Sequence, residues 1–183
     1  MDFRISFNTS PQQLQDVAFI RHLKSCIESY QIDPSHLEME ITEHSIARDF
    51  EKTIQALEHV RSLGLTIAID DFGTGYSSLS YLRRMPINII KIDKIFISEA
   101  IQNLKSRTVV ETILTLANGL GMKTVAEGVE TLEEFNFVKS KGCDYIQGFF
   151  YSKPISTEEM EKYKIDSIRA AENSNPSFLT STA

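Results

Sequence analysis

Two adjacent aspartates, Asp70 and Asp71, follow a short apolar run and precede a loop that contains two glycines. In parallel α/β proteins, ligands and metals bind where a buried strand opens into solvent in this way. Neighbouring carboxylates repel each other, and a divalent cation relieves that repulsion. One aspartate could instead cap the following helix, a position that aspartate favours. The pair followed by Gly-Thr-Gly nevertheless favours a functional loop.

The other expected strands also end in polar side chains. At their carboxyl ends the sequence places carboxylates, amides and a lysine: Asn8, Glu40, Asp70 with Asp71, Lys91, Glu127 and Gln147. If the apolar faces of the strands pack on helices, these side chains converge on one pocket. Carboxylate and amide oxygens suit Mg²⁺, Mn²⁺ or Ca²⁺. The pattern therefore predicts a divalent-metal site, in which Lys91 orients a water or offsets charge.

Six alternations of strand and helix must position these side chains. We expect strands at residues 3–7, 37–41, 66–69, 87–92, 123–126 and 144–149. Helical patterns cover residues 11–30, with a break near Asp16, and residues 49–63, 79–85, 106–120, a segment capped by Thr131, and 157–163. This alternation predicts parallel strands joined by helical crossovers. Two α/β architectures fit it, an open doubly wound sheet and part of a TIM-type β/α barrel.

The 183 residues suffice for one domain with a sizeable core, and the net charge is −6. This charge argues against binding to duplex nucleic acid or to an anionic membrane. No apolar run is long enough for membrane insertion. The two cysteines, Cys26 and Cys143, lack metal-ligand spacing, which predicts reduced thiols and a cytoplasmic location. The chain is polar from Asp166 onward, so we expect one domain over residues 1–165 and a flexible tail over residues 166–183.

Five separated motifs resemble one known family. They are FNTSPQQL, LEMEITEHS, IAIDDFGTGYSSLSYLRRMPINIIKID, TVAEGVET and QGFFYSKPIS. In order and spacing they resemble the EAL-domain cyclic-di-GMP phosphodiesterases of bacteria, from Ile5 to about Ile155. The resemblance implies an incomplete TIM-type barrel, with six of the eight strands present in this chain. It also implies hydrolysis of cyclic-di-GMP to linear pGpG by a two-metal mechanism that uses Mg²⁺ or Mn²⁺.

The resemblance implies roles for individual residues as well. It implies that the metal ligands are Asn8, Glu40, Asp70, Asp71 and Glu127. Lys91 is implied to contact the attacking water, so Lys91 and Glu127 are the expected catalytic residues. Glu43 is implied to anchor the loop after Asp71, and Gln147 to line the substrate site.

The chain departs from the family pattern in several respects, among them Lys94 where arginine is common and Phe149 where tyrosine is common. The segment with the Glu-Ala-Leu signature does not precede Asn8, and Thr9 stands where leucine is usual. We therefore expect weak or no hydrolysis by this chain alone, and a homodimer or a partner protein covering the open strand edges. One alternative is a non-catalytic cyclic-di-GMP receptor or protein-binding regulator of the same family. Another, from chemistry alone, is an enolase-like barrel, which also combines strand-end carboxylates with a lysine base.

Overall fold

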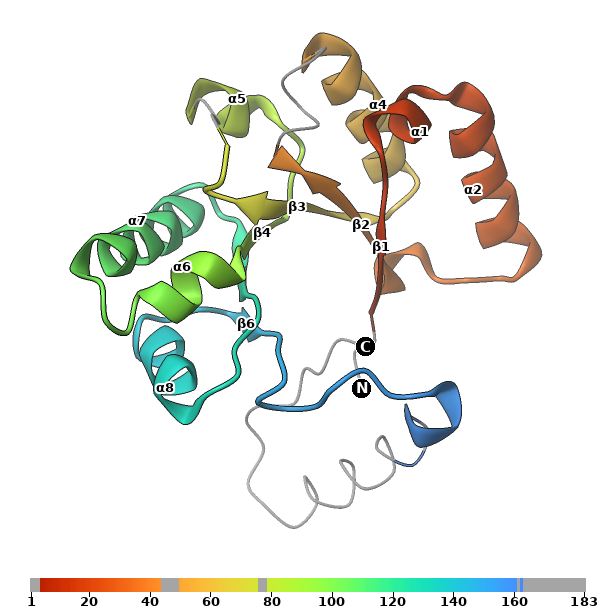
Figure 1. Ribbon diagram of the computed structural model, residues 1–183. Helices are drawn as coiled ribbons and strands as arrows, with labels where there is room; N and C mark the ends of the chain where they lie inside the picture. The colour runs from red at the N-terminus through yellow and green to blue at the C-terminus, as the bar shows by residue number, and fades with distance from the viewer. Residues whose placement is uncertain (1–3, 44–49, 76–78, 161, 163–183) are drawn as a thin grey trace.

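The computed structural model describes residues 4–43, 50–75, 79–160 and 162, and within them a single curled sheet runs through the molecule. Its strands are β1 (Ile5–Asn8), β2 (Leu37–Thr42), β3 (Thr66–Phe72), β4 (Ile89–Ile92), β5 (Lys123–Ala126) and β6 (Tyr145–Ile146). They lie in the order β1-β2-β3-β4-β5-β6, and every neighbouring pair is parallel. In Figure 1 the labelled helices form an arc along the outer side of the strands. The fold is an incomplete TIM-type barrel, as predicted, and not a doubly wound sheet.

Several helices begin at side chains that cap them. They are α1 (Pro11–Gln15), α2 (Val17–Ser29), α4 (Phe50–Ser62), α5 (Leu79–Arg84), α6 (Lys94–Glu99), α7 (Leu104–Gly119) and α8 (Leu132–Ser140), with a 3₁₀ turn, η1, at Pro34–His36. Ser10 and Thr131 form capping boxes with Gln13 and Glu134, respectively. Asp16 ends α1, and its side chain accepts a hydrogen bond from an amide of α2. The predicted break near Asp16 is therefore confirmed.

Several predicted bounds differ from the structure. Helix α6 was not expected, and it begins because the Asp93 carboxylate accepts a hydrogen bond from the Ile95 amide at 2.7 Å. Strand β6 is shorter than expected at both ends, since the Asp144 carboxylate hydrogen-bonds to Thr124 before it and a turn, in which the Tyr151 amide donates to the Gly148 carbonyl at 3.1 Å, follows it. Residues 157–160 are helical, as predicted. The predicted tail, residues 166–183, lies outside the described residues.

The two faces of the sheet carry different side chains. The outer face packs on the helices through a large apolar cluster that includes Met39, Ile41, Ile67, Ile69, Ile90 and Ile92. Other residues of β3, β4 and β5, which alternate with the residues of the large cluster, form a second, small apolar cluster of Ala68, Ile89 and Val125, and Tyr145 packs against it. This second cluster lies on the inner face, because side chains alternate along a strand. Glu40, Asp70 and Lys91 continue the same alternation toward the carboxyl ends of their strands, so they also lie on the inner face.

Within the described residues, the structure contains no helix with both the length and the apolar character needed to span a membrane.

Candidate metal centre

Lys91, on β4, is the hub of a buried ionic cluster. Its Nζ lies 2.8 Å from Glu40 Oε1, 3.2 Å from Asp70 Oδ1 and 2.7 Å from Glu127 Oε1. Only 4% of Lys91 is exposed to solvent. The three carboxylates come from β2, from β3 and from the residue that follows β5. The curled sheet thus brings together side chains that are far apart in the sequence, as the strand-end pattern predicts.

The charges in this cluster do not balance, because three carboxylates surround one ammonium group. Burial lowers the pKa of Lys91, but its attraction and hydrogen bonds to Glu127 and Glu40 outweigh burial and hold that pKa above its ordinary value. Burial raises the pKa of Glu127 to about 7; Lys91 opposes this rise, while Asp70 and Glu40 reinforce it. Lys91 is therefore a charged hydrogen-bond donor at neutral pH and not a general base. A further cation would stabilise the ionised form of Glu127.

An irregularity in β3 brings both aspartates to the same side of the sheet. Adjacent strand residues normally point to opposite faces. Here the pairing with β4 shifts between Ile69 and Phe72, and Asp71 has a left-handed backbone with φ of +54°. Carboxylate oxygens of Asp70, Asp71 and Glu127 consequently lie within 4.8 Å of one another. Bulges of this kind are frequent beside active sites, where they re-aim a side chain.

Asp93 is a member of this site that the sequence analysis missed. Burial raises the pKa of Asp71, and repulsion from Asp70 and a hydrogen bond to Asp93 raise it further. Asp93 therefore lies beside Asp71 while also capping α6. Its position two residues after Lys91 is the signal that could have identified it, because alternate residues share a side of the chain.

The oxygens of this cluster fit a divalent cation. The buried Asp70 Oδ1 takes part in no hydrogen bond within the described residues, and its 3.2 Å approach to Lys91 is a charge contact only. Carboxylate oxygens gathered within a few ångströms of one another are the ligands that Mg²⁺, Mn²⁺ and Ca²⁺ take in proteins. Asp70, Asp71 and Glu127 are thus the best-placed candidate ligands, and Glu40 lies next to them across Lys91.

Asn8 and Gln147 stand at the edges of the site. Asn8 pairs in register with Glu40, so the two residues lie side by side on β1 and β2. The main chain of Gln147 is fixed by bonds to Ala126 and Val129, at 2.9 and 3.1 Å. Across the described parts of the chain, no hydrogen bond joins the side chain of Asn8 or Gln147 to the ionic cluster. The structure therefore brings Glu40, Asp70, Asp71, Lys91 and Glu127 together, and among the described residues it shows no side-chain hydrogen bond from the two amides to this group.

Glu43 holds the start of the glycine loop. Its Oε2 accepts hydrogen bonds from the amides of Gly73 and Gly75, at 2.9 and 3.1 Å, and only 4% of the residue is exposed. A Cβ atom on Gly75 would lie 2.9 Å from the Glu43 carboxyl group, so a glycine allows this close approach. The geometry agrees with the anchoring role that the family resemblance implies for Glu43.

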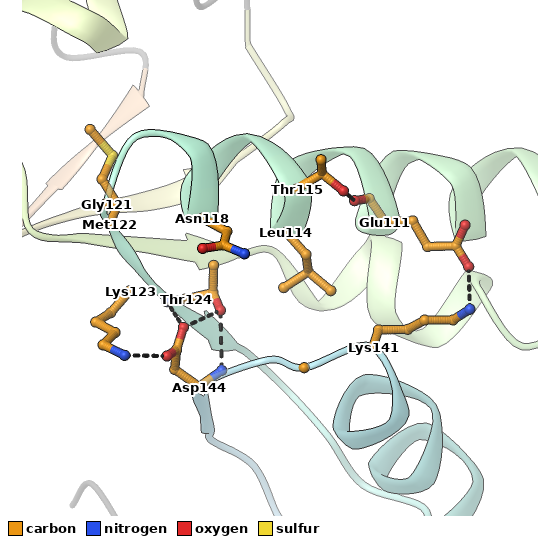
Figure 2. Close-up of a pocket in the computed structure, with 11 residues that line it drawn as sticks. Glu111, Leu114, Thr115, Asn118, Gly121, Met122, Lys123, Thr124, Lys141 and Asp144 are labelled. Atoms are coloured by element: carbon orange, nitrogen blue, oxygen red, sulfur yellow. Dashed lines mark hydrogen bonds and ion pairs between the residues drawn. The ribbon is translucent and has the colours of Figure 1, made fainter.

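A separate cavity of about 460 Å³ lies beside α7 and the segment that joins α8 to β6 (Figure 2). Its charged side chains pair with one another, Lys123 with Asp144 at 2.6 Å and Lys141 with Glu111 at 2.8 Å. The cavity lies at the beginning of β5, where Lys123 stands, whereas Glu127 follows the end of that strand. It therefore forms no part of the ionic cluster.

A curled parallel sheet with helical crossovers and an acidic cluster at the carboxyl ends of its strands places the chain in the β/α-barrel class. The EAL domain family model matches residues 1–154, and the chain belongs to this family. It is 38% identical over 165 residues to the signaling protein YkoW of Bacillus subtilis, covering 90% of this chain and 21% of YkoW. It is 34% identical over 160 residues to the cyclic di-GMP phosphodiesterase NbdA of Pseudomonas aeruginosa, covering 87% of this chain and 20% of NbdA. The chain thus spans about a fifth of the length of these curated relatives.

Solved structures show the same likeness. The PaMucR phosphodiesterase in complex with c-di-GMP has a TM-score of 0.83 and 37% identity, covering 87% of this chain and 64% of PaMucR. A manganese and cyclic-di-GMP complex of Klebsiella pneumoniae BlrP1 has a TM-score of 0.78 and 31% identity, covering 84% of this chain and 39% of BlrP1. EAL domains therefore bind divalent metals, and these matches lend no support to the enolase-like alternative.

Proposed function

We propose that this chain carries the metal centre of a cyclic-di-GMP phosphodiesterase domain, which hydrolyses cyclic-di-GMP to linear pGpG with two Mg²⁺ or Mn²⁺ ions. The observation that carries the proposal is the buried cluster of Glu40, Asp70 and Glu127 around Lys91, with Asp71 beside it. The cyclic-di-GMP complex of PaMucR and the manganese complex of BlrP1 support the substrate and the class of metal.

In this proposal each side chain has a defined task. The metal ligands are the side-chain oxygens of Asn8, Glu40, Asp70, Asp71 and Glu127. Bound divalent cations supply charge neutralisation at the phosphate and activation of water. Lys91 keeps its proton, so it donates hydrogen bonds to the attacking water or to a phosphate oxygen but accepts no proton. Gln147 lines the substrate site, and Glu43 fixes the loop after Asp71 through its two amide hydrogen bonds.

The charge of the site sets an order of binding. Without a cation, the acidic cluster repels a cyclic dinucleotide, whose two phosphates are anionic. Loading with two divalent cations offsets the negative charge of the four carboxylates around Lys91 and raises the affinity for the dinucleotide. Metal binding therefore precedes substrate binding in this proposal, and both take place in the cytoplasm.

The extent and the partners of the domain belong to the same proposal. We assign residues 1–165 to one partial EAL domain. We also propose that a second copy or a partner protein packs on β1, where Ile5 is 49% exposed. Sedimentation of the purified chain at several concentrations tests self-association.

Incubation of the purified chain with cyclic-di-GMP and Mn²⁺, followed by chromatography of the products, tests the proposed activity. Slow formation of pGpG, in keeping with the weak hydrolysis expected of this chain alone, that stops with EDTA and in Asp70→Asn but continues in Glu51→Gln is the expected result. Glu51 is a matched acidic control, because it is paired with Arg84 on the surface, away from the cluster. Binding of cyclic-di-GMP without turnover would favour the receptor alternative. Binding of neither Mn²⁺ nor the dinucleotide would refute the proposal.

A further inference from the structure

A second buried carboxylate lies on the inner face, next to the metal centre but outside it. Glu38 precedes Glu40 by two residues on β2, so both side chains lie on the same face, and only 4% of Glu38 is exposed. Its Oε2 lies 3.0 Å from Arg4 Nη1, and its Oε1 accepts a hydrogen bond from Ser6 Oγ at 3.1 Å. Both partners lie on the segment that leads along β1 to Asn8. Glu38 therefore ties β1 to β2 through side chains as well as backbone.

Strand β1 needs such a tie to hold its register. It has four residues and, within the described parts of the chain, pairs with β2 alone. Its apolar side chains specify the register weakly, because Ile5 is 49% exposed and Phe7 is only partly buried. A slip by one residue turns every side chain of a strand to the opposite face. Such a slip would move Arg4 and Ser6 away and leave the Glu38 carboxylate buried without partners, which is strongly unfavourable.

We propose that Glu38 is a positioning residue for the metal centre, which acts by holding β1 in the register that sets Asn8 beside Glu40. This inference rests on the proposed function, because it gives Asn8 a task at the metal. Ser6 pairs in register with Glu38, and Asn8 pairs with Glu40. The hydrogen bond between Ser6 and Glu38 therefore lies two residues before Asn8, on the same face of the sheet. On the other side of Asn8, the Thr9 amide donates to the Glu40 carbonyl at 2.8 Å. Asn8 is thus held between a side-chain tie and a backbone hydrogen bond.

The test is a titration of the full chain with Mn²⁺, in which electron paramagnetic resonance measures the free ion. The variants are Glu38→Gln, which removes the charge, and Ser6→Ala, which leaves every charge in place. We expect each to bind Mn²⁺ about tenfold more weakly, as is typical when a partner that orients a metal ligand is lost. Glu51→Gln, which removes a surface carboxylate paired with Arg84, should bind like the unaltered chain. Circular dichroism and urea unfolding verify that each protein is folded at the titration conditions.

A double-mutant cycle separates positioning from a direct effect of charge. If Glu38 acts through Asn8, Glu38→Gln causes no further loss of Mn²⁺ affinity in an Asn8→Ala background. An additive loss there would mean that the Glu38 charge acts on the metal directly, and would overturn the inference. Unchanged Mn²⁺ affinity in folded Glu38→Gln and Ser6→Ala would overturn it as well.

The inference and the proposed function fail in different ways. Absence of Mn²⁺ binding by the unaltered chain would overturn both. If the chain binds Mn²⁺ and the cycle behaves as expected, but the metal-loaded chain neither binds nor hydrolyses cyclic-di-GMP, the positioning role of Glu38 stands and the phosphodiesterase proposal does not.

Discussion

Replacing Lys91 with methionine tests whether the acidic cluster depends on a single cation when no metal is present. Methionine has a similar length and is apolar, so the substitution removes the charge with little change in volume. Lys91 is 4% exposed and contacts three carboxylates at 2.7 to 3.2 Å. Removing one partner of a buried ion pair typically costs about 3–5 kcal/mol, because the other partner stays buried without compensation. We expect Lys91→Met to lose about that much free energy of unfolding at pH 8 in EDTA.

The loss of free energy of unfolding in Lys91→Met should increase with pH. Burial raises the Glu127 pKa from 4.5 to about 7 even with Lys91 present. A carboxyl group with a raised pKa binds its proton more tightly in the folded state, so stability falls as pH rises from the pKa of the unfolded chain to the pKa of the folded protein, is unaffected below the first and stays constant above the second. The rise at Glu127 corresponds to about 3 kcal/mol between pH 4.5 and pH 8. Lys91 is the group that opposes the rise of the Glu127 pKa, so that pKa is higher still without it, and the deficit of Lys91→Met should grow from pH 5 to pH 8.

Urea unfolding followed by circular dichroism measures this deficit at the two pH values. Lys123→Met is the matched control, because the Lys123 side chain is 61% exposed and solvent screens its pair with Asp144. Addition of Mn²⁺ at pH 8 should restore part of the stability of Lys91→Met, since a bound cation replaces the missing charge. Equal stability of Lys91→Met and the unaltered chain at pH 8, or a deficit that is larger at pH 5, would refute the reasoning.

Three further predictions concern other parts of the site. Thr9→Val should raise the free energy of unfolding by about 1 kcal/mol in urea, because the buried Thr9 hydroxyl makes no hydrogen bond within the described residues. Glu43→Ala should speed amide hydrogen exchange at Gly73 and Gly75 and lower the stability by about 2 kcal/mol, because two amides lose a charged acceptor. Mn²⁺ affinity should rise from pH 6 to pH 8, with a midpoint near the Glu127 pKa of about 7, because binding requires the ionised carboxylate.

Each of these predictions has its own control. Thr124→Val should destabilise the protein, in contrast to Thr9→Val, because the Thr124 hydroxyl donates to Asp144 at 3.0 Å. Glu51→Gln should leave exchange in the glycine loop unchanged, since Glu51 pairs with Arg84 instead. Glu127→Gln should flatten the pH dependence of Mn²⁺ binding. Stabilisation by both threonine changes, or the same pH profile in Glu127→Gln, would contradict the corresponding argument.

The sequence predicted the sheet well because periodicity and turn residues act locally. Strand β5 was predicted with the bounds that the structure has, since Gly121 and Gly128 bracket an unbroken strand pattern. Strand β3 extends to Phe72, beyond the predicted end, because a bulge carries the pairing past the two aspartates. Helix α6 was missed because six residues are too few to show a helical period.

The sequence predicted only those parts of the site that follow from the alternation of side chains between the two faces of a strand. Alternation predicts that Glu40, Asp70 and Lys91 share the inner face, and the ion pairs confirm that they meet. It cannot predict that Asp71 joins them, because the bulge with its left-handed residue depends on the neighbouring strand. Nor can it separate Glu38 from Glu40, which are equivalent by spacing. The difference arises in three dimensions, where Arg4 reaches the first and Lys91 the second.

The strand order has a consequence for how the molecule is made. Every strand pairs with the one before it in the chain, so the sheet can grow from one side while the ribosome is still adding residues. Lys91 meets Glu40 and Asp70 early in that process, and Glu127 arrives last of its carboxylate partners. Nascent chains that end before β5 therefore lack Glu127, one of the carboxylates of the ionic cluster. The complete set of candidate metal ligands is thus present only late in synthesis.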